Sequence, residues 1–183
     1  MGCLTSSSKE EDISMALQSS KKLKIVIVGL EGSGKTSILQ YLKNGKFIEA
    51  QPTIGLNVET IQFKARHYLV FDVGGKVRTL WSHYYENLDG LVFVIDTTDP
   101  ERIEIVKNEL KKLGSEINHL KQIVLLIYLN KIDLPRSAPM ELSKDIQQQE
   151  SDVIMQRCSA KTGEGIWEGI DKMNKLLDHK FQQ

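Results

Sequence analysis

Residues 24–40 read KIVIVGLEGSGKTSILQ, a short apolar run followed by a glycine-rich loop and an apolar-periodic segment. The loop has the spacing G-x-x-x-x-G-K-T between a predicted strand and a predicted helix, which is the context that a phosphate-binding P-loop requires. Glycines let backbone N–H groups close around an anion, and the helix N-terminus adds the positive end of its dipole. Lys35 can then reach the β- and γ-phosphates, and Thr36 can offer its hydroxyl to Mg²⁺. The alternative is a glycine-rich turn that binds nothing.

Length and composition are those of one ordinary globular domain. The chain has 183 residues, of which 40% are apolar and 26% are charged, and its formal net charge is zero. Nothing in this balance suggests nucleic acid as a partner. Cys3 and Cys158 lie far apart and lack metal-ligand spacing, which favours a reduced cytosolic setting over a disulfide framework. The longest apolar run, Ile123 to Leu129, is too short to cross a bilayer.

The N-terminus carries a different signal. Residues 1–6 read MGCLTS, which fits the M-G-x-x-x-[ST] pattern for myristoylation of Gly2. Cys3 beside it is a candidate for S-palmitoylation, and a second acyl chain matters because one myristoyl chain binds membranes only reversibly. An unmodified start is the alternative. We expect residues 1–22 to be a flexible, acylated segment that holds a globular domain, residues 23–183, on the cytoplasmic side of a membrane.

The rest of the chain alternates between strand and helix patterns. Strands are predicted from apolar, β-branched and aromatic runs, and those at 56–64 and 67–71 should form a hairpin. The predicted strands are 25–28, 56–64, 67–71, 91–95, 123–129 and 153–158. The predicted helices are 35–43 before Asn44-Gly45, a helical segment at 78–86, a helix from the Asp99-Pro100 cap to Gly114, and a C-terminal helix with Ile166, Ile170, Met173 and Leu177 on one face.

Uniformly apolar strands are buried on both faces. We therefore expect an α/β fold with a mostly parallel six-stranded sheet, one antiparallel edge hairpin and helices on both faces. Ligands bind such sheets at the C-terminal ends of the strands. Four polar clusters should meet at that edge, and they are residues 29–36, 72–75, 130–133 and 158–161.

Two of these clusters indicate the ligand. Asp72 ends an apolar strand, where its carboxylate can hold Mg²⁺ directly or through water, although an ordinary strand-terminating acid would look the same. In Asn130-Lys131-Ile132-Asp133, the Asp133 carboxylate can accept hydrogen bonds from guanine N1 and N2. Adenine cannot donate these bonds, so ATP would leave polar groups unpaired. Lys131 offers an aliphatic stem to cover the base. A small P-loop ATPase or kinase is the alternative that this cluster argues against.

The four clusters together resemble the signature of Ras-like small GTPases. Three stretches narrow the resemblance to the Arf/Arf-like family, namely PTIGLNVET at 52–60, DVGG at 72–75 and LWSHYY at 80–85. It runs from about Lys24 to the C-terminus. It implies the P-loop NTPase fold of small GTPases, a monomeric Mg²⁺-dependent GTP/GDP switch in membrane trafficking and signal transduction, and effectors, an exchange factor and an activating protein as partners. Arf proteins are also typically myristoylated at the N-terminal glycine.

The resemblance assigns further roles. Thr53 completes Mg²⁺ coordination and senses the γ-phosphate, the N–H of Gly75 contacts that phosphate, and the N–H of Ala160 faces guanine O6. Leu56, Phe71 and Tyr84 match an apolar effector-binding patch, although core packing would give the same periodicity. The expected nucleotide contacts are Gly29, Leu30, Glu31, Gly32, Ser33, Gly34, Lys35, Thr36, Ser37, Thr53, Asp72, Gly75, Asn130, Lys131, Asp133, Ser159, Ala160 and Lys161. The expected metal ligands are Thr36, Thr53 and, through water, Asp72.

The chain departs from the family pattern at one functional place. Arf proteins usually read DVGGQDK, whereas residues 72–78 read DVGGKVR, two residues short relative to Leu80-Trp81. Either Lys76 replaces the glutamine, or the glutamine and its neighbour are absent. Both leave no side-chain amide to orient the attacking water, and Glu31 is an acid where slow Arf GTPases also carry one. We therefore expect slow GTP hydrolysis, and a GTP- or GDP-locked binding scaffold is the alternative.

The N-terminal segment departs from the pattern too. It is longer and less apolar than the usual Arf amphipathic helix. In the family, the hairpin slides by two residues between nucleotide states and releases the N-terminal anchor. Stable anchoring through Gly2 and Cys3 together is the alternative to that coupled release.

Overall fold

A central β-sheet organises the molecule in this computed structural model, which describes residues 22–76, 78–117, 123–135 and 153–181. Six strands pair in the order β2-β3-β1-β4-β5-β6. All neighbours are parallel except β2 and β3, which form an antiparallel hairpin at one edge. The strands are β1 (Leu23–Val28), β2 (Leu56–Phe63), β3 (Arg66–Val73), β4 (Gly90–Asp96), β5 (Val124–Asn130) and β6 (Val153–Arg157). The predicted fold class is confirmed.

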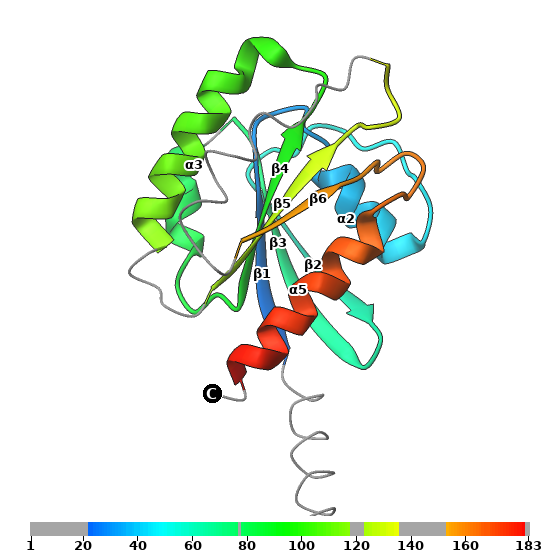
Figure 1. The fold of residues 1–183 in the computed structure, drawn as a ribbon, viewed down its shortest axis with the longest axis vertical. Helices are drawn as coiled ribbons and strands as arrows, with labels where there is room; N and C mark the ends of the chain where they lie inside the picture. Colours follow the sequence, from blue (N-terminus) through cyan, green and yellow to red (C-terminus); the bar gives the residue numbers. More distant parts are fainter. Residues whose placement is uncertain (1–21, 77, 118–122, 136–152, 182–183) are drawn as a thin grey trace, which may run out of the picture.

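Helices cover both faces of this sheet. Figure 1 shows α3 on one side and both α2 and α5 on the other. The α-helices in the described residues are α2 (Lys35–Asn44), α3 (Ile103–Ile117) and α5 (Ile166–Phe181). Two 3₁₀ helices complete the layers, η1 (Arg78–Tyr84) and η2 (Pro100–Arg102). None of the described helices is long and apolar enough to span a membrane.

The core is divided by the alternation of side chains along each strand. Ile25 and Ile27 of β1 face the layer of α2 and α5, whereas Val26 and Val28 face the layer of α3 and η1. Because both sets are buried, β1 reads in the sequence as a continuous apolar run rather than an alternating one. The strand that carries the P-loop is therefore fixed from both sides.

Helix ends confirm some predicted signals and correct another. Gly45 ends α2 in the left-handed conformation, φ 69°, and its N–H bonds the carbonyl of Tyr41. The Asp99 carboxylate caps the following turn by accepting from the N–H of Arg102. The prediction that Gly114 ends its helix is wrong, because α3 continues to Ile117. A mid-helix glycine costs only about 1 kcal/mol, which the burial of Leu113 beside it offsets.

The free end of the edge hairpin rests on the C-terminal helix. Phe63 at the end of β2 stacks on Trp167 of α5 with ring centroids 4.9 Å apart. Farther along β3, the buried hydroxyl of Tyr68 donates to the side-chain oxygen of Asn174. These contacts hold the end of the hairpin that lies far from the P-loop.

Candidate nucleotide-binding site

The P-loop connects the buried end of β1 to the start of α2, and its glycines make that connection possible. Gly29 has φ +144°, and a Cβ there would lie 2.3 Å from the carbonyl oxygen of Val94 on β4. Gly34 has φ +93°, and a Cβ there would lie 2.3 Å from the side-chain nitrogen of Asn130. No side chain fits at either position, so the spacing in the sequence reflects close packing against two neighbouring strands.

Lys35 is the buried cation of this loop. Its ammonium group donates to the carbonyl oxygens of Gly29 and Leu30, each at 2.9 Å. Burial lowers the pKa of Lys35 to about 8, against the opposing attraction of Asp72 and Glu31. The loop thus holds a positive charge that is only partly compensated, which suits a polyphosphate ligand.

A cluster of three side-chain oxygens lies beside the loop. The hydroxyl of Thr36 donates to Asp72 Oδ2 at 2.7 Å and lies 2.7 Å from the hydroxyl of Thr53. Thr53 also lies 3.3 Å from the same carboxylate oxygen. The cluster therefore brings together the three residues that the sequence predicts as metal ligands.

The donor chemistry of this cluster fits Mg²⁺. Asp72 is fully buried, and its Oδ1 has no hydrogen-bond partner among the described residues. Burial raises the pKa of Asp72, and hydrogen bonds from Thr36 and Thr53 oppose that rise. Oxygen ligands with room for water and phosphate oxygens are what Mg²⁺ prefers. Thr36, Thr53 and Asp72 would hold it.

Two loops from the hairpin close against the P-loop. The N–H of Gly74 donates to the carbonyl of Gly55 at 2.8 Å, which joins the loop before β2 to the loop after β3. A Cβ on Gly75 would lie 2.4 Å from the backbone nitrogen of Glu31. Only a glycine can approach the P-loop this closely, and Gly75 thus lines the cavity directly beside Glu31.

Asn130 ties the other end of the site together. Its side-chain nitrogen donates to the carbonyl of Ser33 at 2.9 Å, and its side-chain oxygen accepts from the N–H of Ala160 at 3.0 Å. The P-loop, β5 and the loop after β6 are therefore joined through one buried amide. Because the N–H of Ala160 already has this partner, a contact with guanine O6 requires that the bond be shared or exchanged.

The residues around Asp133 are arranged by local hydrogen bonds. The hydroxyl of Ser159 donates to Asp133 Oδ1 at 2.6 Å and accepts from the N–H of Lys161 at 3.2 Å. Lys131 bonds Asp96 of β4 at 2.6 Å. Burial alone would raise the pKa of Asp96, but hydrogen bonds from Lys131 and Thr98 hold it below its ordinary value. The Ser159 hydroxyl therefore orients the Asp133 carboxylate, and the described contacts include no ion pair between Asp133 and a lysine.

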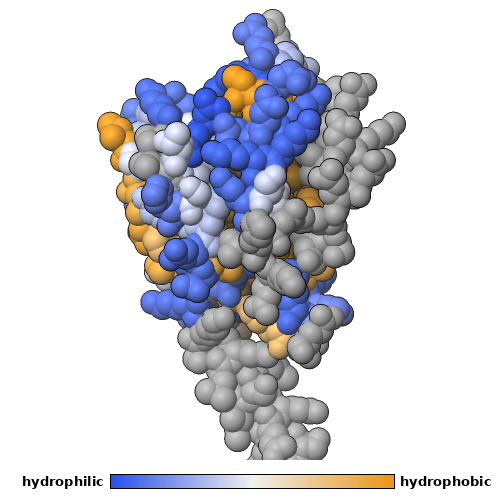
Figure 2. Space-filling view, turned by 90° about the vertical axis from the view of Figure 1, so that its left-hand side faces the viewer, coloured by the Kyte–Doolittle hydropathy of each residue, from blue (hydrophilic) through white to orange (hydrophobic). Residues whose placement is uncertain are grey.

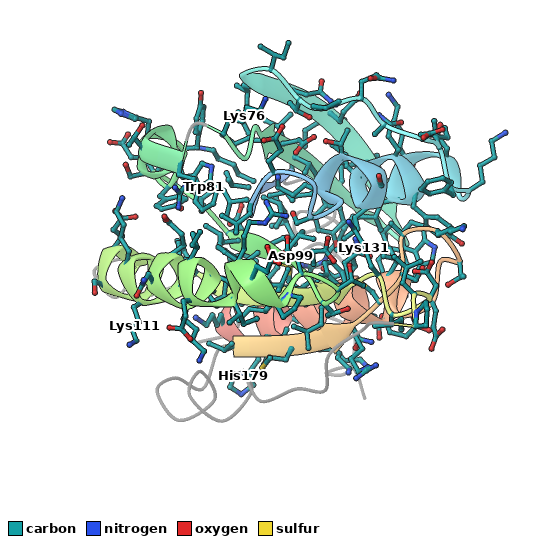
Figure 3. All side chains as sticks on the ribbon, turned by 90° about the horizontal axis from the view of Figure 1, so that it is seen from above. Lys76, Trp81, Asp99, Lys111, Lys131 and His179 are labelled. Atoms are coloured by element: carbon teal, nitrogen blue, oxygen red, sulfur yellow. The ribbon has the colours of Figure 1, made fainter. Side chains whose placement is uncertain are left out.

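One cavity of about 650 Å³ joins these features, a size typical of small-molecule sites. Figure 3 looks onto this edge of the molecule, with Lys76 and Lys131 at different sides of the loop that precedes α2. Predicted residues that line the cavity are Glu31, Gly32, Gly34, Lys35, Thr36, Ser37, Thr53, Gly75, Asn130, Lys131, Asp133, Ala160 and Lys161. Gly29, Leu30, Ser33, Asp72 and Ser159 do not line it, but each is hydrogen-bonded to a residue that does.

Lys76 and Arg102 both contact the P-loop at Glu31. Lys76 lines the cavity, and its ammonium lies 3.1 Å from Glu31 Oε1. Arg102 of η2 donates to the carbonyl of Glu31 at 2.8 Å and pairs with Asp99. Sequence reasoning missed Arg102, since the only local signal was the helix cap at Asp99 and the partner is a backbone carbonyl far away in the chain.

The predicted effector patch is divided between core and surface. Phe71 and Tyr84 are half-buried against the α3 layer, with ring centroids 6.4 Å apart. Leu56 is exposed, and Ile54 and Val58 beside it are exposed as well. Figure 2 shows the α3 side of the molecule as mainly hydrophilic, with hydrophobic atoms gathered along its left-hand edge. Core packing therefore accounts for Phe71 and Tyr84, whereas Leu56 is exposed and its role in effector binding stays a prediction. Gly2 and Cys3 lie outside the described residues.

Comparison with known proteins agrees with this site. The model of the ADP-ribosylation factor (Arf) family matches residues 10–177. Among solved structures, the Arl6 BBS3 small GTPase from Trypanosoma brucei, with the nucleotide analogue GppNp bound, superimposes with a TM-score of 0.78 at 29% sequence identity. The alignment covers 87% of this chain and 99% of that one. The chain belongs to the Arf family of small GTPases.

Proposed function

We propose that this protein is a guanine-nucleotide switch that binds Mg²⁺-GTP and Mg²⁺-GDP at the sheet edge and recruits effectors at a membrane. The observation that carries the proposal is that one cavity has a P-loop lysine and the two threonine hydroxyls of the oxygen cluster at one end and Asp133 at the other. A nucleoside triphosphate has the matching layout, with its phosphates at one end and its base at the other. Arf-family small GTPases generally bind and hydrolyse GTP, which supports the same reading.

Different residues would bind different parts of the nucleotide. Lys35 and the backbone N–H groups of the P-loop neutralise the phosphates. Bound Mg²⁺ would neutralise charge on the β- and γ-phosphates, with Thr36, Thr53 and Asp72 as its protein oxygens. Asp133 accepts hydrogen bonds from guanine N1 and N2. Ordering of the loops at Thr53 and Gly75 by the terminal phosphate then presents the hairpin surface to effectors.

Hydrolysis in this protein is proposed to be slow. An amide side chain can both donate to and accept from an attacking water, whereas the ammonium of Lys76 only donates. No glutamine lies between Gly75 and the start of η1 at Arg78. A scaffold that holds GTP without turnover is therefore the second candidate function, favoured by the same segment.

Three measurements test these proposals. Purified protein should contain GDP or GTP, and GTP should displace a fluorescent guanine nucleotide at concentrations where ATP does not. Equal competition by ATP would contradict the guanine assignment. Single-turnover hydrolysis, with and without an activating protein, separates a slow GTPase from a locked scaffold. A rate equal to that of a glutamine-containing Arf protein would contradict slow turnover.

Membrane attachment is proposed to use Gly2 and Cys3, with residues 1–22 as a tether and residues 23–183 as the nucleotide-binding domain. The MGCLTS start supports this proposal, and two acyl chains give stable attachment where one does not. Gly2→Ala should release the full-length protein into the cytosolic fraction of cells. Cys3→Ser should leave it partly membrane-bound, and an unchanged partition in that variant would count against palmitoylation.

A further inference from the structure

An ion pair lies at the end of the cavity where the terminal phosphate is expected. The ammonium of Lys76 is 3.1 Å from Glu31 Oε1, and both residues line the cavity together with Lys35. Glu31 follows the P-loop's Gly29-Leu30 start, and Lys76 follows Gly75, which packs directly against Glu31 and Leu30. A cation and an anion from two touching loops thus lie side by side in the cavity lining.

Contacts with neighbouring loops hold the backbone before Lys76 in place. The position of the Lys76 ammonium is therefore set by the backbone as well as by its long side chain. A Cβ on Gly75 would lie 2.4 Å from the nitrogen of Glu31 and 2.6 Å from the carbonyl carbon of Leu30. Gly74 is bonded to Gly55 at 2.8 Å. Lys76 therefore starts from a backbone that touches the P-loop.

The other charges at this end already have fixed partners. Lys35 is buried and bonded to two P-loop carbonyls, and Arg102 is bonded to Asp99 and to the carbonyl of Glu31. The pair of Lys76 and Glu31 is different, since the side chains are 71% and 44% exposed. Ion pairs this exposed contribute little. A phosphate oxygen, with higher charge and in a less solvated site, would compete successfully for the ammonium.

We propose that Lys76 is a specificity-determining residue that favours the triphosphate over the diphosphate, by moving from Glu31 to the terminal phosphate. The proposal rests on guanine-nucleotide binding at this site. The P-loop backbone cradles the inner phosphates and its lysine reaches the β- and γ-phosphates. The cavity continues from Lys35 to Glu31, Gly75 and Lys76, so a third phosphate would lie nearer to these residues than a diphosphate does. There it meets a carboxylate that would repel it and an ammonium that binds it.

The test compares affinities for a non-hydrolysable GTP analogue and for GDP, both with Mg²⁺, by displacement of a fluorescent guanine nucleotide. Lys76→Met should weaken binding of the GTP analogue about tenfold, the effect of losing one charge-assisted hydrogen bond. Its affinity for GDP should change less than about twofold. Glu31→Gln should shift the ratio the other way, because the competing carboxylate is gone. Lys111→Met, on α3 and away from the cavity in Figure 3, removes the same charge as a matched control and should change neither affinity.

The double variant separates direct contact from screening. If Lys76 binds the phosphate, Glu31→Gln with Lys76→Met should prefer the GTP analogue less than Glu31→Gln alone. Equal preference would mean that Lys76 only screens Glu31 and would overturn the proposal, as would equal losses for both nucleotides in Lys76→Met. Thermal unfolding without nucleotide checks that each variant folds. Failure of the wild-type protein to bind either nucleotide would refute the proposed function, whereas binding with an unchanged ratio refutes this inference alone.

Discussion

Among single residues, Lys35 shows most directly how the burial of a cation prepares the site for a negatively charged ligand. Its ammonium has only carbonyl oxygens as hydrogen-bond partners in the described contacts, and burial lowers its pKa to about 8. The free protein therefore loses this proton as the pH rises through 8, while bound phosphates would keep Lys35 protonated. Proton uptake must then accompany binding in alkaline solution.

The pH dependence of affinity tests this coupling. Between pH 7 and pH 8.5, the affinity for GDP should fall about fourfold, because the protonated fraction of Lys35 in the free protein falls by that factor. Isothermal titration across this range measures it. Lys35→Met should bind more weakly and lose the pH-dependent fall. A wild-type affinity that is flat across the range would contradict a lowered pKa.

Asn130 shows that a residue expected to contact the base has a structural task as well. It bonds Ser33 on one side and Ala160 on the other, both at buried positions. Asn130→Ala should reduce the free energy of unfolding by about 2 kcal/mol even without nucleotide, because two buried backbone groups lose their partners. Urea unfolding measures it. Asn108→Ala on the exposed face of α3 is the matched control and should change stability by less than about 0.5 kcal/mol.

At the scale of elements, strand periodicity predicted the sheet well, and tertiary contacts account for what it missed. The hairpin, the buried strands and the C-cap at Gly45 follow from local patterns that the fold does not override. Gly114 is a local stop signal that packing of α3 overrides. The approach of Lys76 and Arg102 to Glu31 depends on how three loops pack, and no local pattern encodes such a contact.

The β2–β3 hairpin gives an element-scale prediction. Tyr68 donates from a buried hydroxyl to Asn174 of α5, and burial raises the pKa of Tyr68 to about 12, so it stays a donor at neutral pH. Tyr68→Phe should lower stability by about 1–3 kcal/mol, since the Asn174 oxygen loses its donor while packing is retained. Hydrogen exchange should rise along β3 and α5. Tyr41→Phe, at a half-buried tyrosine of α2, serves as the control, and equal effects of the two changes would show that the hydrogen bond is unimportant.

At the scale of the whole molecule, loops from several strands meet at one edge of the sheet. β1, β3 and β5 each deliver a loop to the cavity there, and the loops before β2 and after β6 complete it. Hydrogen bonds join these loops to one another, such as those of Asn130 and Gly74. A ligand that contacts all of them binds only the folded state and so stabilises the entire fold.

Thermal unfolding with different nucleotides tests two points together: whether one ligand stabilises the entire fold, and whether the site prefers guanine. At about 100 times its dissociation constant, Mg²⁺-GDP should stabilise the fold by about 2.7 kcal/mol, which raises Tm by about 5–10 °C for a domain of this size. Mg²⁺-ATP at the same concentration should raise Tm by less than about 1 °C, since adenine leaves Asp133 without its donors. Asp133→Ala should lose most of the GDP shift while keeping its own Tm without nucleotide, because Asp133 is exposed and its one hydrogen bond in the described contacts, from Ser159, is local. An equal shift with ATP would mean that the cavity recognises phosphates alone and not guanine.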